Sequence, residues 1–207
     1  MPMKAQAKKS FVEAPAGRRK RAPKGKASDE FLTPVELSTL AKKIFGVPID
    51  YDPYASKGQI VPARDGLTIH SEPEPWPDTG KWWANIPFSV SAQVMRKLTA
   101  HFAEHQAIDA LVLTLAAPSS LYWRQCFWSS VGPRRIAWIP RVSFLRLDES
   151  GVAQPTKHSV SSDLALSLWT SDPKLVARFE RTIREWNPAT RGPSKDWPIH
   201  VSPGGRP

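Results

Sequence analysis

The chain has 207 residues, of which 41% are hydrophobic, and a formal net charge of +10. This length suits one folded domain with tails, and no apolar run approaches the roughly 20 residues that a membrane-spanning helix needs. The first residues lack the apolar stretch of a secretory signal, and the single cysteine, Cys126, excludes an internal disulfide. We therefore predict a cytoplasmic protein with no membrane partner, in which Cys126 is buried among aromatic residues.

Most of the positive charge lies at the N-terminus. Residues 1–28 contain nine Lys or Arg against one acid, Glu13, so only +2 of the +10 belongs to the other 179 residues. Such an arm cannot bury enough apolar surface to fold, but it can displace counterions from phosphates. We predict a disordered arm that contacts nucleic acid, with a solvated tail or a nuclear-import-like signal as alternatives. Its densest run is Arg18, Arg19, Lys20 and Arg21.

The folded domain is predicted over residues 29–186, because residues 187–207 are rich in Pro and Gly and read as a disordered tail. Thr33, Pro34 and Glu36 form a capping-box pattern that opens a helix ending at Gly46. A short strand then runs into a turn at residues 50–53. Residues 57–80 hold seven Gly and Pro residues, which indicates an irregular loop.

The second half of the domain alternates between strand and helix patterns. A buried strand at 81–84 is followed by a helix that we expect Ser91 to cap, with an apolar line of Val94, Leu98 and Phe102. The continuous apolar run 110–115 is typical of a central parallel strand covered on both faces. Further elements are expected at 120–128 (helix), 135–139, 142–147 and 164–169 (strands), and 172–186 (helix). This order predicts an α/β three-layer sandwich with a mixed sheet.

Asn85-Ile86-Pro87-Phe88 follows the strand at 81–84 and is the stretch that carries chemistry. Adenine N6 is a poor nucleophile, because its lone pair is delocalised, and acceptors for both N–H groups can draw that pair out of conjugation. The Asn85 side chain and the Ile86 carbonyl are the candidate acceptors. Pro87 disfavours the α region for Ile86, and Phe88 offers a ring for base stacking. The alternative is an ordinary Asn-Pro turn at a strand end.

Several blocks, in the right order, resemble the phage-type DNA N6-adenine methyltransferases. They are Asp-Glu-Phe-Leu-Thr-Pro at 29–34, Ile-Asp-Tyr-Asp-Pro-Tyr-Ala-Ser at 49–56 and Gly-Lys-Trp-Trp-Ala-Asn-Ile-Pro-Phe-Ser at 80–89. Residues 111–117, Trp123 and 140–144 echo the later blocks. The resemblance implies a Rossmann-like methyltransferase fold, S-adenosylmethionine as cofactor, adenine N6 in DNA as target, and a phage or prophage origin in a bacterial cytoplasm.

The resemblance also implies roles for individual residues. Asn85, Ile86, Pro87 and Phe88 would face the adenine. The cofactor pocket would include Thr33, Pro34, Asp50, Asp52 and Pro53, where Asp52 suits charge-assisted hydrogen bonds to the cofactor's ammonium or hydroxyl groups. A solvated strand end with an Asp-Pro turn is the alternative for the two acids.

Two positions depart from the family's pattern. The family usually has Asn-Pro-Pro-Tyr, whereas Ile86 and Phe88 resemble the Asn-Ile-Pro-Tyr and Asn-Leu-Pro-Phe patterns of ribosomal RNA adenine dimethyltransferases. Tyr54 stands where the family prefers Ala. The same chemistry on RNA, and an inactive methyltransferase-like protein that binds DNA, are therefore alternatives.

Arginines are interleaved with aromatic residues between 123 and 146, a combination that suits a nucleic-acid groove, although a solvated face over a core is the alternative. Arg141 is the best candidate for a phosphate contact, with Arg124 next. His101 and His105 are spaced i, i+4 on a helix, but no third ligand lies near them in the sequence. Because zinc needs at least three protein ligands, we predict no metal site.

Overall fold

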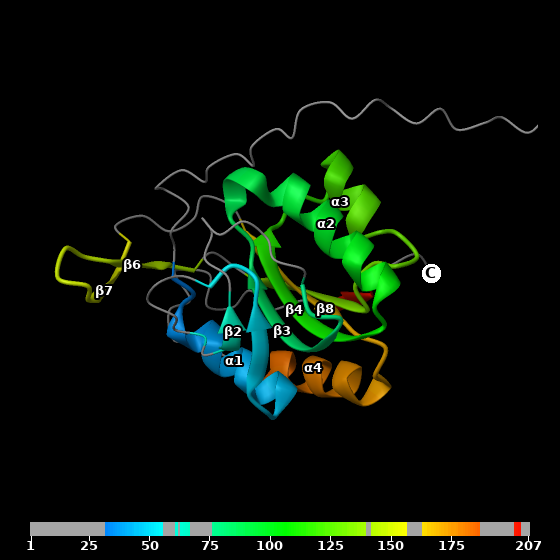
Figure 1. The fold of residues 1–207 in the computed structure, drawn as a ribbon, viewed down its shortest axis with the longest axis horizontal. Coiled ribbons are helices and arrows are strands. Elements are labelled where there is room, and N and C mark those ends of the chain that lie inside the picture. Colours follow the sequence, from blue (N-terminus) through cyan, green and yellow to red (C-terminus); the bar gives the residue numbers. More distant parts are fainter. Residues whose placement is uncertain are drawn as a thin grey trace, which may run out of the picture.

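A computed structural model describes residues 32–55, 61, 63–66, 76–139, 142–156, 163–186 and 201–203. Its largest feature is one seven-stranded sheet in the order β2-β1-β3-β4-β8-β5-β9 (Figure 1). The strands are β1 (Ile49–Asp52), β2 (Ala63–Gly66), β3 (Thr79–Asn85), β4 (Ala107–Leu115), β5 (Arg135–Ile139), β8 (Leu164–Trp169) and β9 (Val201–Pro203). No helix in these ranges has the length and apolar character required to cross a membrane.

The sheet is mixed. Strands β1, β2, β3 and β4 run parallel, whereas β8 lies antiparallel between β4 and β5, and β9 pairs antiparallel with β5. The predicted mixed α/β architecture, with antiparallel strands late in the chain, is confirmed. The central strand β4 contains five consecutive buried residues, which agrees with its continuous apolar run.

Helices cover both faces of the sheet (Figure 1). On one face lie α2 (Ser91–Glu104) and α3 (Leu121–Cys126), above a core that includes Trp82, Trp123 and Phe127. On the other lie α1 (Val35–Phe45) and α4 (Pro173–Glu185), above a core that includes Trp83 and Phe179. Each helix presents an apolar stripe to the sheet, so the three-layer arrangement follows from the sequence pattern.

Helix starts differ in detail from the expectation. The capping box at Thr33 is wrong: Pro34 takes the N-cap position of α1, without a side-chain cap hydrogen bond. Ser91 is the first residue of α2, and its hydroxyl donates back to the carbonyls of Pro87 and Phe88. Asp172 caps α4 as the sequence indicates, because its carboxylate accepts from Lys174 N–H at 2.8 Å.

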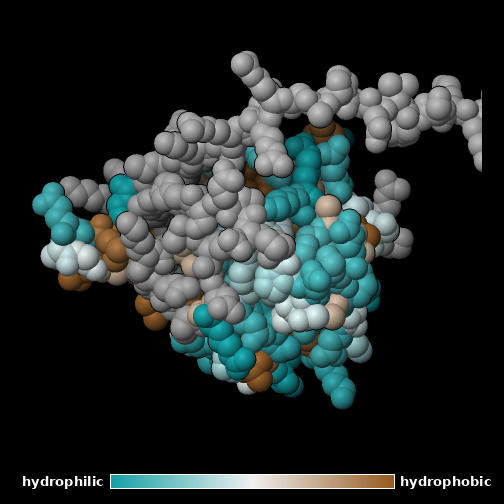
Figure 2. Space-filling view, in the orientation of Figure 1, coloured by the Kyte–Doolittle hydropathy of each residue, from teal (hydrophilic) through white to brown (hydrophobic). Residues whose placement is uncertain are grey.

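Three strand predictions also need correction. Strand β2 lies inside the segment that reads as an irregular loop, and β9 lies inside the predicted disordered tail. Only Leu145–Leu147 of the expected strand 142–147 is extended, as β6, and it pairs with β7 (Ala153–Pro155) in a separate hairpin. The hairpin projects from the body and carries hydrophobic side chains at its surface (Figures 1 and 2). Val152, between its strands, is 52% exposed.

Candidate functional site

The parallel strands β1, β3 and β4 end at the same edge of the sheet, which we call the carboxyl edge. From β1 the chain crosses to β2 on one side, and from β3 it crosses to β4 on the other. Ligands of open α/β sheets bind in the crevice where the crossover direction reverses. Here that point lies between β1, which ends at Asp52, and β3, which ends at Asn85.

Asp52 and Asn85 project from the same face of the sheet. Tyr51 is in register with Trp82, and their rings contact each other on the α2 side at a centroid distance of 4.8 Å. Because side chains alternate along a strand, Asp52 and Asn85 point to the opposite face, the one covered by α1 and α4. The acid and the amide that the sequence analysis singled out therefore lie on the same face, at the ends of neighbouring strands.

Asp52 is buried, with 4% of its surface exposed. Its Oδ1 accepts a hydrogen bond from Tyr54 N–H at 2.9 Å. Burial raises the pKa of this carboxyl from 3.8 to about 7, because desolvation outweighs the Tyr54 hydrogen bond. Within the described part of the chain no Lys or Arg pairs with Asp52. A buried carboxylate without a cation is the electrostatic complement of a positively charged ligand.

Three other residues predicted for the cofactor belong to the segments that flank α1 and β1. Thr33 (7% exposed) and Pro34 come directly before α1. The C-terminus of α1 leads through residues 46–48 into the amino end of β1, so the N-terminus of α1 lies toward the carboxyl edge. Pro53 is buried directly after Asp52. Tyr54, the residue that departs from the family pattern, packs against the core on the α2 side and still lies near Asp52: burial first, and then the charges of Tyr51 and Asp52, raise the pKa of its hydroxyl.

Asp50 has a structural role that differs from the environment of Asp52. Its Oδ2 accepts from Lys81 N–H at 2.9 Å, and its Oδ1 lies 3.6 Å from Arg64 Nη1. Gly80, with φ of +106°, brings its backbone against the Asp50 side chain, an approach that a Cβ would crowd. Asp50 therefore joins β1, β2 and β3, and the structure gives no support for the predicted role in cofactor binding.

The tetrapeptide terminates the β3 ladder. Ile86 N–H donates to Leu113 O at 3.0 Å, and the Ile86 side chain is 1% exposed, so residue 86 is anchored in the core on the α2 side. Pro87 follows with φ −59° and ψ 125°, and it has no N–H to continue the sheet. Its carbonyl accepts from Val90 N–H at 3.2 Å.

Phe88 opens the short 3-10 turn η2 (Phe88–Val90). Its ring is half-buried and meets Phe144 edge to face, with centroids 5.6 Å apart. Both rings belong to the core on the α1 side, the face toward which Asp52 and Asn85 point. The two rings therefore lie on the same side of the sheet as the two polar side chains.

The nucleic-acid candidates are less well supported. Arg124 is exposed on α3, in the layer opposite the face of Asp52, and Arg141, Arg18, Arg19, Lys20 and Arg21 lie outside the described residues. Trp123, Phe127 and Phe144 are buried and Trp128 and Trp138 are half-buried, so most of the aromatic side chains of the proposed groove are core. Arg135 forms an ion pair with Glu180 on α4.

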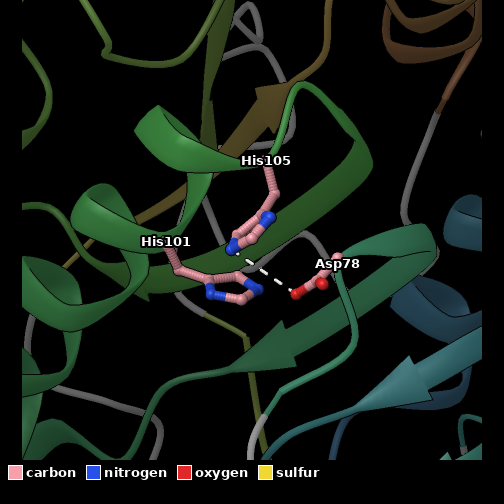
Figure 3. A group of neighbouring side chains, drawn as sticks. All are labelled: Asp78, His101 and His105. Carbon is pink, nitrogen blue, oxygen red and sulfur yellow. Dashed lines mark ion pairs between the residues drawn. The ribbon is translucent and has the colours of Figure 1, made fainter.

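The sequence analysis missed one cluster. Asp78, just before β3, lies against His101 and His105 of α2, so a third group that could ligate a metal stands beside the two histidines (Figure 3). The order of β3 and α2 in the chain could have indicated this cluster. A helix that returns antiparallel to the preceding strand places its last turn, here with the two histidines, beside the start of that strand, here with Asp78. This cluster lies at the opposite edge of the sheet from Asn85.

No protein-family model matches the chain, and no curated protein matches it.

Proposed function

We infer that the protein transfers a methyl group from S-adenosylmethionine to adenine N6 in DNA, within a Rossmann-like methyltransferase fold. One observation carries this proposal. A buried carboxyl that no described Lys or Arg pairs with (Asp52) and an amide (Asn85) project from the same face at the reversal point of the sheet, the side on which the Phe88 ring also packs. A carboxyl, an amide and an aromatic ring are groups that suit a cationic cofactor and a planar amine substrate.

Asn85 and Ile86 would act on the nucleophile. The Asn85 side-chain oxygen and the Ile86 carbonyl would each accept one N6–H, which localises the lone pair on nitrogen as the new N–C bond forms. The Ile86 side chain anchors that backbone in the core, and its N–H is held by Leu113 O at 3.0 Å. The Phe88 face would stack on an extruded base, and the product can lose its proton afterwards to water.

Asp52 would hold the cofactor. The cofactor supplies an electrophilic methyl group on a sulfonium, and its ammonium and ribose hydroxyls are suitable partners for a carboxylate. The fit rests on burial: desolvation makes an ionised Asp52 costly, as its raised pKa of about 7 indicates, and a bound cation would offset that cost. Thr33 and Pro34 at the start of α1 would line the same pocket.

The test is incorporation of labelled methyl groups from S-adenosylmethionine into DNA, RNA and protein. We expect incorporation into DNA adenine, with a loss of about 10²-fold or more in Asn85→Ala, the scale of a lost oxyanion-type contact. Calorimetry should give the same cofactor affinity for both proteins. Gln93→Ala, an exposed change on α2, is the matched control and should keep full activity.

Each other result points to a different function. Incorporation into RNA alone would mean that the protein carries out the same chemistry on RNA and not on DNA. Salt-sensitive DNA binding without cofactor binding would identify a DNA-binding protein that has lost the chemistry. Full activity in Asn85→Ala would contradict the proposed role of the tetrapeptide.

A further inference from the structure

The last turn of α2 presents two imidazoles to the start of β3. His101 and His105 lie on one face of the helix, with ring centroids 4.4 Å apart. Asp78 faces them from the residue before β3, and its Oδ1 lies 3.4 Å from His105 Nε2 (Figure 3). One ligand atom from each of the three residues falls within 4.8 Å of the other two.

Aromatic packing fixes the His101 ring. It stacks on Trp82 at 5.3 Å, with 27° between the planes, and meets the edge of Trp76 at 5.5 Å. Its Nε2 lies 2.9 Å from the carbonyl oxygen of Pro77. A ligand held in one orientation loses little conformational freedom when it binds.

Charge at this position favours a cation. The cluster lies at the C-terminus of α2, where the helix dipole is negative, and it contains one carboxylate and two imidazoles. Imidazole nitrogen with carboxylate oxygen suits zinc and its first-row neighbours better than Ca²⁺ or Mg²⁺, which prefer all-oxygen sites.

We propose that Asp78, His101 and His105 form a zinc site. Tetrahedral zinc with bonds of about 2.0–2.1 Å places its ligand atoms about 3.4 Å apart, so separations that lie within 4.8 Å here must close by at most about 1.4 Å. Asp78 can make this adjustment, because its side chain is 68% exposed. Water or the Pro77 carbonyl completes the four ligands, and His101 coordinates through Nε2 with the proton on Nδ1.

The bound ion has a structural role. It fastens the segment that leads into β3 to the end of α2, at the edge of the sheet opposite Asp52 and Asn85. The Trp82 ring, which packs on both His101 and Tyr51, connects the cluster to β1. Zinc therefore holds β3, the strand that carries Asn85, in place. The site does not depend on whether the protein transfers methyl groups.

The test is Zn²⁺ titration of the full chain by calorimetry, after treatment with a chelator and dialysis. We expect a zinc site whose affinity falls at least about 10–100-fold in both Asp78→Asn and His105→Gln, since even loss of an outer-sphere partner has that effect. His158→Gln, which removes a histidine that is not one of the three, is the matched control and should bind as wild type does. Zn²⁺ should also raise the Tm of wild type and of His158→Gln.

A second readout separates coordination from misfolding. Co²⁺ at a tetrahedral site gives intense d–d absorption, which should appear in wild type and be lost in Asp78→Asn, an isosteric change at an exposed side chain. Absence of zinc binding by wild type would overturn the proposal. So would equal affinity in wild type, Asp78→Asn and His105→Gln, because the zinc would then lie elsewhere.

Discussion

Asp52 and Asn85 end adjacent parallel strands and project from the same face of the sheet, although 33 positions separate them in the sequence. The arrangement arises because the chain leaves β1 and β3 in opposite directions, and the carboxyl ends of two such strands are where open α/β sheets bind their ligands. One side chain is a buried acid and the other a neutral amide. A positively charged ligand beside Asp52 and a hydrogen-bond donor beside Asn85 would therefore be held next to each other.

The buried acid makes folding depend on pH. The folded-state pKa of Asp52, about 7, lies above its unfolded value of 3.8, so the folded protein holds the proton more tightly. The stability that Asp52 contributes by binding this proton is fully present below pH 3.8 and is lost as pH rises through 7. The free energy of unfolding changes by up to about 4 kcal/mol over this range. Asp52→Asn should raise the free energy of unfolding at pH 8 and change it little at pH 4, as urea unfolding at both values would measure.

Asp50→Asn is the matched control for this effect. It makes the same chemical change two residues earlier on β1, where the carboxylate is engaged by Lys81 N–H and Arg64. We expect it to be neutral or destabilising at pH 8. A loss of stability in Asp52→Asn at pH 8 would show that the buried carboxylate has a cationic partner in the folded protein.

Cofactor affinity should depend on pH in the opposite sense. Only the carboxylate form of Asp52 attracts the cofactor's ammonium, and with a pKa of about 7 that form becomes scarce in acid. The Kd for S-adenosylmethionine should rise about tenfold per pH unit below pH 7 and level off above pH 8. Calorimetry from pH 5.5 to 8.5 would measure it, and a flat profile would remove Asp52 from the cofactor site.

Local patterns predicted the elements whose signals are complete within the sequence. Helix α4 begins at Pro173 after its Asp172 cap, and the apolar line Val94, Leu98 and Phe102 is buried as expected. β4 lies at the centre of the sheet, as its unbroken apolar run indicates. In each case caps and periodicity alone specify the element.

The elements that were missed depend on distant partners. Strand β2 has the sequence Ala-Arg-Asp-Gly and is extended because it pairs with β1, with Ala63 opposite Ile49. Strand β9 pairs with β5, with Pro203 opposite Arg135. Neither segment has an apolar alternation, so no local pattern indicates them. The proximity of Asp78 to His101 and His105 was missed for the same reason, because it depends on how the chain returns from β3 through α2 and not on a local pattern.

The Phe88 ring should matter for substrate more than for cofactor. Stacking of a base on an aromatic side chain contributes about 1–3 kcal/mol, so Phe88→Ala should raise the KM for DNA by about 5–150-fold. Phe88→Tyr keeps the ring face and should retain activity. Phe144→Leu removes the edge contact without removing the stacking ring, and it separates a packing effect from a loss of stacking. Equal KM in Phe88→Ala and wild type would contradict the assignment.

The basic arm should contribute affinity without specificity. Residues 1–28 carry nine Lys or Arg against Glu13, and they lie outside the described residues. Their deletion should weaken DNA binding at low salt and make log Kobs less steep against log salt concentration, because fewer counterions are released. Filter binding on sites of different sequence would test this. A changed order of preference among the sites would show that the arm reads bases.

Replacement of Ser167 should lower the free energy of unfolding, because this small polar side chain is buried in the sheet and has two hydrogen-bond partners. It is fully buried on β8, where its Oγ donates to Val112 O on β4 at 3.2 Å and accepts from Trp169 Nε1 at 3.0 Å. Ser167→Ala leaves the Trp169 N–H buried without that acceptor, which should cost about 1–3 kcal/mol of unfolding free energy. Ser171→Ala, which removes a serine donor to the Gln106 carbonyl at an exposed position, should change it by less than about 0.5 kcal/mol. Equal unfolding midpoints for the two variants in urea would mean that a water molecule or a shift of the Trp169 ring satisfies the indole.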